Sequence, residues 1–254
     1  MDFTIKLPNN FRHIHLEQCS STMEVAAANT EELSGKILLI TTDEQTAGRG
    51  QRGNHWESAS GKNLLFSLVL EPEGVRAGTQ FHLSEATALS ALCAIRDTLP
   101  PTLRDAVRIK WPNDIYVNDS KVCGMLLEHT VLRSMIVRTN IGIGINVNQT
   151  RFISDAPNPV SLCQVLGHEL SRSEVLESFL THFISFRRML ASPETLHDIY
   201  LTNLYRRTSM HKYRDEHGEF CAQIADIHPD GRLCLLLQNG ERRTYAFKEV
   251  AFVL

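Results

Sequence analysis

The amino-acid sequence predicts an α+β fold with two parts, a larger region of strands and packed helices and a small β-barrel. In the larger region, strand-like segments alternate with helical segments that carry apolar stripes. Pro193 precedes the last helical segment, and the helical pattern is lost after Arg207. From Ser209 onward the chain consists of short strands separated by turns at 215–218, 228–231 and 239–240. We therefore expect domains of residues 1–207 and 208–254.

The first half of the larger region predicts three strands and one helix. The strands are expected over residues 11–19, 36–45 and 63–70, where apolar residues are frequent. An alanine-rich helix is expected from Ser21 to about Asn29. Ser21 lies three residues before Glu24, which is the spacing of a capping box, so Ser21 is the expected N-cap.

The second half predicts three longer helices around a group of strands. A helix over 79–99 is closed by Pro100 and Pro101, and a second helix begins at Ser171, three residues before Glu174. A third helix is expected over 194–207. The strands are expected over 107–111, 115–117, 121–128 and 135–148, with a turn at 118–120 that makes a hairpin of the middle two.

Composition and charge exclude several classes of protein. The chain has 254 residues, 43% hydrophobic and 22% charged, and a net charge of −3, which gives no electrostatic footprint for nucleic acid. No apolar run approaches the roughly 20 residues of a membrane-spanning helix, and the N-terminus does not resemble a signal peptide. A cytoplasmic protein without a membrane partner is expected. The six cysteines form no C-x-x-C pair, and the P-loop pattern is absent.

The loop over residues 46–56 combines three glycines with two arginines between two predicted strands. Glycine allows the backbone to approach a ligand closely, and arginine offers a fixed fork of donors to phosphate or carboxylate. This combination suits a loop that folds over an anionic ligand, although a single loop of this kind could equally be a solvated hairpin.

Two further motifs make the ligand-binding interpretation specific. They are Lys110-Trp111-Pro112-Asn113-Asp114, which is followed by the segment 121–128, and the glycine-containing segment 142–148. Together with the Gly/Arg loop, and in this order, they resemble the biotin protein ligases over nearly the whole chain. The resemblance implies a catalytic domain with a mixed β-sheet and a C-terminal domain like that of Src homology 3. Residues 1–10 precede the first strand, so we expect the form without an N-terminal DNA-binding domain.

The resemblance implies a reaction in two steps with ATP and biotin as substrates and Mg²⁺ as a cofactor. Biotin attacks the α-phosphorus of ATP to give biotinyl-5′-AMP and pyrophosphate. A lysine of a biotin carboxyl carrier protein then attacks the acyl carbon and releases AMP.

The family pattern assigns roles to residues of this sequence. Lys121, Arg49 and Arg52 are expected to be catalytic, since two anions that approach each other need cations between them. The expected biotin-binding residues are Ser21, Thr22, Met23, Gln45, Gly48, Arg49, Gly50, Gln51, Lys121, Gly124, Gly142 and Gly144. The expected ATP-binding residues are Arg49, Arg52, Trp56, Lys110, Asn113, Asp114, Lys121 and Asn146.

Two positions depart from the family pattern. Met23 stands where the family has asparagine, so a side-chain hydrogen bond expected there is lost. Gln51 stands where many members have arginine, so a charge contact is lost while the backbone N–H can still serve.

Three other functions compete with this interpretation. A lipoyl or octanoyl ligase or transferase shares the catalytic fold, but its Arg-Arg-x-x-Gly-Gly-Gly loop is absent. A biotin-sensing transcriptional repressor is disfavoured by the charge, and a non-catalytic biotin binder by Lys121 and the two arginines. The acceptor protein, the choice between monomer and homodimer, and the metal ligands do not follow from the sequence.

Overall fold

The computed structural model describes residues 5–154 and 157–253, and its larger part is built on a seven-stranded mixed sheet. The strands lie in the order β1-β2-β3-β7-β6-β5-β4; β1 and β2 are parallel and all other neighbours are antiparallel. Their bounds are β1 Phe11–Cys19, β2 Ile37–Gln45, β3 Leu64–Leu70, β4 Val107–Lys110, β5 Asp114–Val117, β6 Ser120–Leu132 and β7 Met135–Ile145.

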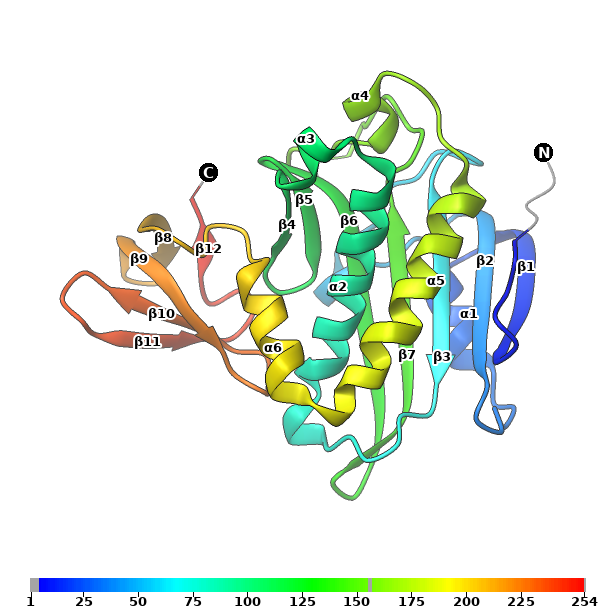
Figure 1. The fold of residues 1–254 in the computed structure, drawn as a ribbon, viewed down its shortest axis with the longest axis horizontal. Coiled ribbons are helices and arrows are strands. Elements are labelled where there is room, and N and C mark those ends of the chain that lie inside the picture. Colours follow the sequence, from blue (N-terminus) through cyan, green and yellow to red (C-terminus); the bar gives the residue numbers. More distant parts are fainter. Residues whose placement is uncertain (1–4, 155–156, 254) are drawn as a thin grey trace.

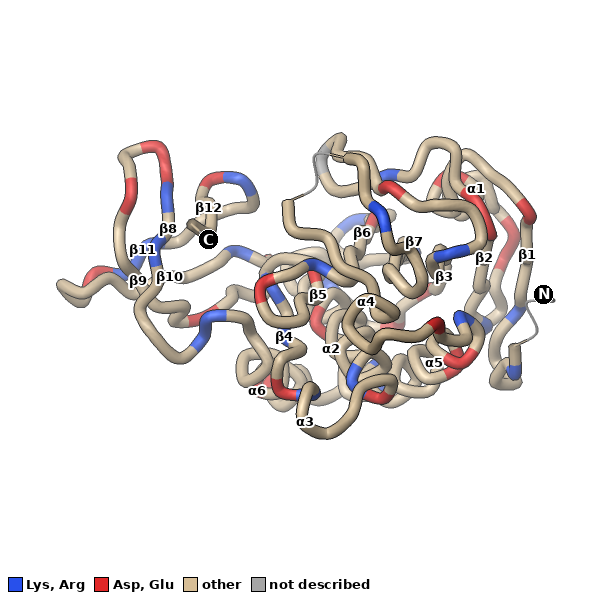
Figure 2. The backbone as a smooth tube through the Cα atoms, turned by 90° about the horizontal axis from the view of Figure 1, so that it is seen from above, with Lys and Arg blue, Asp and Glu red and all other residues tan. Residues whose placement is uncertain are grey.

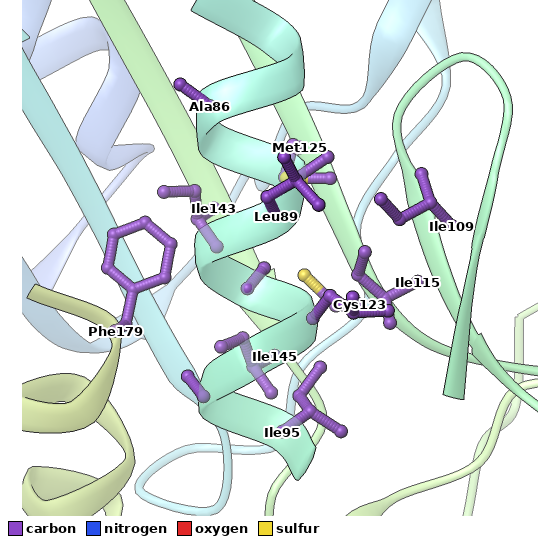
Figure 3. Packing of buried hydrophobic residues seen from close by; sticks show 14 of the residues in the cluster. Ala86, Leu89, Ile95, Ile109, Ile115, Cys123, Met125, Ile143, Ile145 and Phe179 are labelled. Atoms are coloured by element: carbon purple, nitrogen blue, oxygen red, sulfur yellow. The ribbon is translucent and has the colours of Figure 1, made fainter. Parts of the chain in front are cut away.

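The two faces of this sheet are used differently. The long helices α2 (Phe81–Thr98) and α5 (Arg172–Arg188) cover one face, and α6 (Pro193–Thr202) lies beside α2 (Figure 1). Figure 3 shows Leu89 and Ile95 of α2 gathered with sheet side chains that include Met125, Ile143 and Ile145. The short helix α1 (Thr22–Ala28) packs against β2, β3 and β7 on the other face.

Strand periodicity explains this division. In β7, Ile141, Ile143 and Ile145 belong to the core under α2 and α5. Because successive side chains of a strand point to opposite faces, the alternate residues Gly142 and Gly144 face the side of α1. The face under α2 and α5 is therefore a packed core. On the α1 face, Gly142 and Gly144 leave the middle of β7 without side chains.

The C-terminal part is a five-stranded antiparallel sheet in the order β11-β10-β9-β8-β12. The strands are β8 His211–Asp215, β9 Gly218–Ile227, β10 Leu233–Leu237, β11 Arg242–Tyr245 and β12 Ala251–Phe252. This sheet stands at one end of the larger sheet, beyond β4 and α6 (Figure 1). The expected α+β fold is confirmed, and the division at residue 207 stays a prediction.

Polar contacts join the two sheets. Trp111 Nε1 donates to the carbonyl oxygen of Gly231 at 2.9 Å. The buried carboxylate of Glu85 in α2 contacts His82 and also His197 of α6, and the second ring nitrogen of His197 contacts Asp226 of β9 at 2.8 Å. The hydrogen bond to Glu85, and to a smaller extent the one to Asp226, raises the pKa of His197 to about 9. Both ring nitrogens of His197 therefore donate at neutral pH.

Some local predictions were wrong in detail. Ser21 is the N-cap of α1, as expected, but its hydroxyl accepts from Met23 N, and the Glu24 carboxylate accepts from Ser20 instead of closing a capping box. The last helix ends at Thr202, because Asn203 caps it and Arg206 then adopts a φ of 59°. Helix α4 (Leu162–Leu166) was not predicted, although Ser161 and Gln164 form a capping box there. The remaining helices are the four-residue α3 (Pro101–Arg104) and the 3-10 turns Gln51–Gly53, Ala77–Thr79 and Met189–Ala191.

Charge and hydropathy agree with the composition. Figure 2 shows Lys and Arg interspersed with Asp and Glu over both sheets. Within the described part of the chain, no helix is long and apolar enough to cross a membrane.

Candidate functional site

The three sequence motifs come together around one small cavity, of about 50 Å³, on the α1 face of the large sheet. Its lining includes most of the residues expected to bind biotin: Ser21, Thr22, Met23, Gln45, Arg49, Gly50, Gln51, Lys121, Gly124, Gly142 and Gly144. Gly48 lies directly behind Gln45. Of the residues expected to bind ATP, Arg49, Trp56, Asn113, Asp114 and Lys121 line the same cavity.

The floor of the cavity is a row of paired residues that crosses the sheet. The strand registers place Leu65 opposite Gly144, Gly144 opposite Gly124, and Gly124 opposite Asp114. The two glycines leave room that other residues fill. A Cβ added to Gly144 would lie 2.4 Å from Trp56 Cε2, and one added to Gly124 would lie 2.7 Å from Trp56 Cζ3. The indole of Trp56 therefore rests on the glycine floor.

Met23 closes the neighbouring part of the floor. A Cβ added to Gly142 would lie 2.6 Å from Met23 Cγ. The methionine side chain is buried, so the position where the family has an amide presents an apolar surface to the cavity.

A short chain of hydrogen bonds fixes the amide of Gln45. Ser67 Oγ donates to Thr22 Oγ1 at 2.8 Å, and Thr22 Oγ1 donates to Gln45 Oε1 at 3.1 Å. The backbone N–H of Thr22 also donates to Gln45 Oε1, at 2.8 Å. Since both lone pairs of this oxygen are used, Gln45 can offer only its NH₂ group to a ligand.

Lys121 reaches the cavity because of an irregularity in the sheet. The register between β5 and β6 shifts at Ile115/Tyr116, so that Cys123 pairs with Ile115 but Lys121 pairs with Tyr116. Such a bulge turns a side chain to the other face of the sheet. Lys121 Nζ accordingly lies 2.7 Å from Asp114 Oδ1 and 5.7 Å from the centroid of the Trp56 ring. Its backbone is held by Asn158 O and Val160 N.

The Gly/Arg loop is folded on itself over the cavity. Gly50 N donates to Asn54 O at 2.7 Å and Trp56 N donates to Gly48 O at 2.9 Å. Arg49 forms an ion pair with Glu128 at 2.8 Å, and both side chains are about two-fifths exposed, at 42% and 38%. A pair this exposed contributes only about 0–1 kcal/mol, so it can open readily for an incoming anion. The side chain of Arg52 lies outside the described residues.

Three of the residues expected to bind ATP either lie outside the cavity lining or use their polar group to bond the protein itself. Asn113 lines the cavity, but its amide donates to Met125 O and holds the turn. Asn146 lies outside the cavity lining and donates to Val160 O at 3.1 Å. Lys110 is also outside the lining, although it pairs with Asp114 at the end of the floor row. Burial, more than the charges of Lys121 and Arg206, lowers the pKa of Lys110.

The structure also shows whether Cys123 could act as a nucleophile and whether the described side chains alone could hold a metal ion. Burial raises the pKa of the Cys123 thiol, so this cysteine is a packing residue and not a nucleophile. Within residues 5–154 and 157–253, no group of three His, Cys, Asp or Glu side chains could hold a metal ion. Asp114 is the carboxylate of the cavity lining, which suits a magnesium ion that is bound largely by substrate phosphates.

The fold and the site together define a class of protein. A mixed sheet carries a cavity with a fixed amide donor, an ammonium group and a Gly/Arg loop, which is an arrangement that can bind a carboxylic acid beside a phosphate. The family model for biotin/lipoate A/B protein ligases matches residues 16–148. The chain belongs to this family.

Individual relatives specify the branch. A biotin–[acetyl-CoA-carboxylase] ligase of Paracoccus denitrificans is 33% identical over 179 residues, which are 69% of this chain and 72% of the relative. The bifunctional ligase/repressor BirA of Bacillus spizizenii is 29% identical over 243 residues, 92% of this chain and 72% of the relative. The biotin protein ligase of Aquifex aeolicus in complex with biotin and ATP matches with a TM-score of 0.74 at 23% identity, over 94% of this chain and 97% of that one. The resemblance to biotin protein ligases is confirmed.

Several residues of the cavity were not found from the sequence. Ser67 and Glu128 contact site residues through the pairing of distant strands, and the lining also includes Leu65, Met125, Leu126 and Ile143. The apolar run of β3 gives a weak signal for Ser67, because it is the one polar residue of this strand. No local signal marks Glu128 as the partner of Arg49.

Proposed function

We propose that this biotin protein ligase activates biotin with ATP to biotinyl-5′-AMP and transfers biotin to a lysine of a biotin carboxyl carrier protein. The observation that carries the proposal is that one cavity combines the fixed NH₂ donor of Gln45 with the ammonium of Lys121. The first suits a ureido carbonyl oxygen and the second a carboxylate. The biotin and ATP named with the Aquifex aeolicus structure agree with this pair of substrates.

The ureido end of biotin is assigned to the α1 side of the cavity. Gln45 would donate to the ureido oxygen, and Ser21 and Thr22 lie beside it at the start of α1. Met23, Gly142 and Gly144 would provide an apolar surface against which the fused rings pack. Gly48, Gly50, Gln51 and Gly124 would complete this surface through their backbone.

Lys121 is assigned to the reacting groups. The biotin carboxylate and the α-phosphate repel each other, and an ammonium between them lowers that repulsion most as the new P–O bond forms. Arg49, released from Glu128, would bind the acyl-adenylate together with Arg52 and shield it from water. Asp114, 2.7 Å from Lys121, would keep the ammonium in position until the phosphate arrives.

The nucleotide is assigned to the side of the cavity formed by β5, β6 and the Gly/Arg loop. Trp56 would stack on adenine. Lys110, Asn113, Asp114 and Asn146 would lie near the phosphates or support the residues that bind them. Mg²⁺ would arrive with ATP and take Asp114 as a protein ligand. The cytoplasmic location stays a prediction from the sequence.

The test is a biotin-dependent adenylation assay followed by transfer. Pyrophosphate release with ATP should require biotin, and a carrier domain incubated with the protein, ATP and biotin should gain one biotinyl group by mass spectrometry. Equal release with lipoate or octanoate would assign the protein to the competing enzymes of the same family. A gel-shift assay with duplex DNA tests the repressor alternative separately.

A further inference from the structure

Lys110 lies at the end of the floor row, on the same face of the sheet as Lys121. It pairs with Asp114 across β4 and β5, and Asp114 pairs with Gly124 across β5 and β6. Residues paired in this way share a face of the sheet. Lys110 therefore borders the phosphate side of the proposed site although it is not part of the cavity lining.

Two aromatic rings hold the Lys110 ammonium. Its Nζ is 5.1 Å from the ring centroid of Tyr116 and 4.9 Å from that of Phe252, which belongs to the C-terminal sheet. Both distances lie within the range of cation–π attraction, about 6 Å. In the described part of the chain Lys110 forms no ion pair, since Asp114 directs its Oδ1 to Lys121. The rings therefore contact the Lys110 ammonium beside Asp114, a carboxylate whose charge acts on Lys110 but whose ion pair is with Lys121.

Phe252 is itself fixed by contacts on both sides. It pairs with Tyr213 of β8, and the two rings meet edge to face with centroids 5.0 Å apart. The next residue, Val253, donates its N–H to Lys212 O at 3.1 Å and accepts from Arg206 Nη1 at 2.7 Å. The strand β12 is short, but its position over Lys110 is well determined.

The charges around the Lys110 ammonium favour the binding of a polyanion. The charges of Asp114, Lys121 and Arg206 act on Lys110, and the carboxylate of Asp119 accepts from Tyr205 OH at 2.5 Å. The three cations Lys110, Lys121 and Arg206 outnumber the two carboxylates Asp114 and Asp119, which leaves a local positive excess. Aromatic rings hold an ammonium without neutralising its charge, so Lys110 stays available to phosphate oxygens.

We propose that Phe252 is a positioning residue for ATP: together with Tyr116 it holds Lys110 at the phosphate side of the site, so that the C-terminal sheet sets the affinity for the nucleotide. This inference rests on the proposed function, because it takes ATP as the ligand. A ring is required at position 252, and an apolar side chain of similar size is not sufficient.

The test separates the ring from its packing. Phe252→Leu keeps an apolar side chain and removes the ring, whereas Phe252→Tyr keeps the ring. In the pyrophosphate-release assay we expect Phe252→Leu to raise KM for ATP about tenfold, with KM for biotin unchanged, and Phe252→Tyr to stay within about twofold of wild type. Phe220→Leu is the matched control, because Phe220 stacks on Tyr213 and Tyr245 in the same sheet without contacting Lys110.

A double-mutant comparison assigns the effect to Lys110. In a Lys110→Met background, Phe252→Leu should cause no further rise in KM for ATP, since the ammonium that the ring holds is gone. An unchanged KM in Phe252→Leu, or the same rise in the Lys110→Met background, would overturn the proposal. Thermal unfolding of each variant shows whether it is folded.

A second readout distinguishes failure of this inference from failure of the proposed function. If wild-type protein releases no pyrophosphate with biotin, the proposed function has failed. ATP binding measured by calorimetry then tests the inference alone, with the same expected tenfold loss in Phe252→Leu. Equal binding of ATP by the wild-type protein and this variant would refute it.

Discussion

Replacement of Lys121 by alanine is expected to slow adenylation about a hundredfold while biotin still binds. Two unit charges 4 Å apart interact by about 4 kcal/mol at an effective dielectric constant of 20. Asp114, 2.7 Å from Lys121, already cancels part of this field. We therefore expect a loss of about 3 kcal/mol of transition-state stabilisation, which is roughly two decades in rate.

The partner of Lys121 adds a second expectation. In the alanine variant the Asp114 carboxylate, only 15% exposed, is left unpaired beside the incoming phosphate. This carboxylate repels the phosphate and so adds to the loss of rate in the alanine variant. Lys121→Arg should rescue poorly, since a planar fork does not replace a point charge.

The assay is single-turnover formation of biotinyl-5′-AMP, with biotin affinity measured separately by calorimetry. Lys62→Ala is the matched control, because Lys62 also forms an ion pair at 2.8 Å, with Glu169, but lies outside the cavity lining. Circular dichroism must match wild type before rates are compared. If the folded Lys121→Ala variant adenylates biotin at the wild-type rate, Lys121 is a surface lysine and the reasoning is wrong.

Four further predictions follow from the contacts of the site and of the interface. Gln45→Glu should weaken biotin binding about thirtyfold in calorimetry, or about 2 kcal/mol, since the NH₂ donor of this side chain is lost; unchanged affinity would exclude a ureido contact. Gly144→Ala should abolish biotin binding with little change in Tm, because the new Cβ would lie 2.4 Å from Trp56 Cε2 in a loop that can move; normal binding would show that ligand does not use this floor. Hydrogen exchange over residues 48–54 should slow when biotin and ATP are added, and equal protection would exclude ligand-linked ordering. The pKa of His197, raised from 6.5 to about 9, means that its contacts stabilise the fold fully below pH 6.5 and lose this effect as pH rises through about 9. Urea unfolding should show a decline of roughly 2 kcal/mol over that interval that is absent in His197→Gln; a parallel decline in both proteins would refute the assignment.

Much of the fold could be predicted because its signals are local. The strands β1, β2 and β3, the hairpin of β5 and β6, and helices α2 and α5 follow from apolar periodicity and capping residues. Helix α4 was missed because five residues give too short an apolar pattern, although Ser161 and Gln164 carried the capping signal. Tertiary context decides where the helix before Asn203 ends.

The site could be predicted only in part, since its geometry depends on strand pairing. The motifs identified the glycines, Lys121 and Gln45. The bulge that turns Lys121 toward Gly124 and the bonds that orient Gln45 arise between residues far apart in the sequence. A motif therefore gives the residue types of a site, while the register gives their direction.

The glycine floor also explains why the Gly/Arg loop must move for ligand to bind. In the structure the indole of Trp56 rests on Gly124 and Gly144, and its buried Nε1 has no hydrogen-bond partner among the described residues. An unpaired buried donor costs on the order of 1–3 kcal/mol, so this closed arrangement is not an optimum for Trp56. A ligand ring that takes the floor must displace the indole, and displacement gives Nε1 access to water or to ligand. Trp56 ends the Gly/Arg loop and its N–H is bonded to Gly48 O, so a backbone movement that carries the indole off the floor also breaks this bond, next to Arg49.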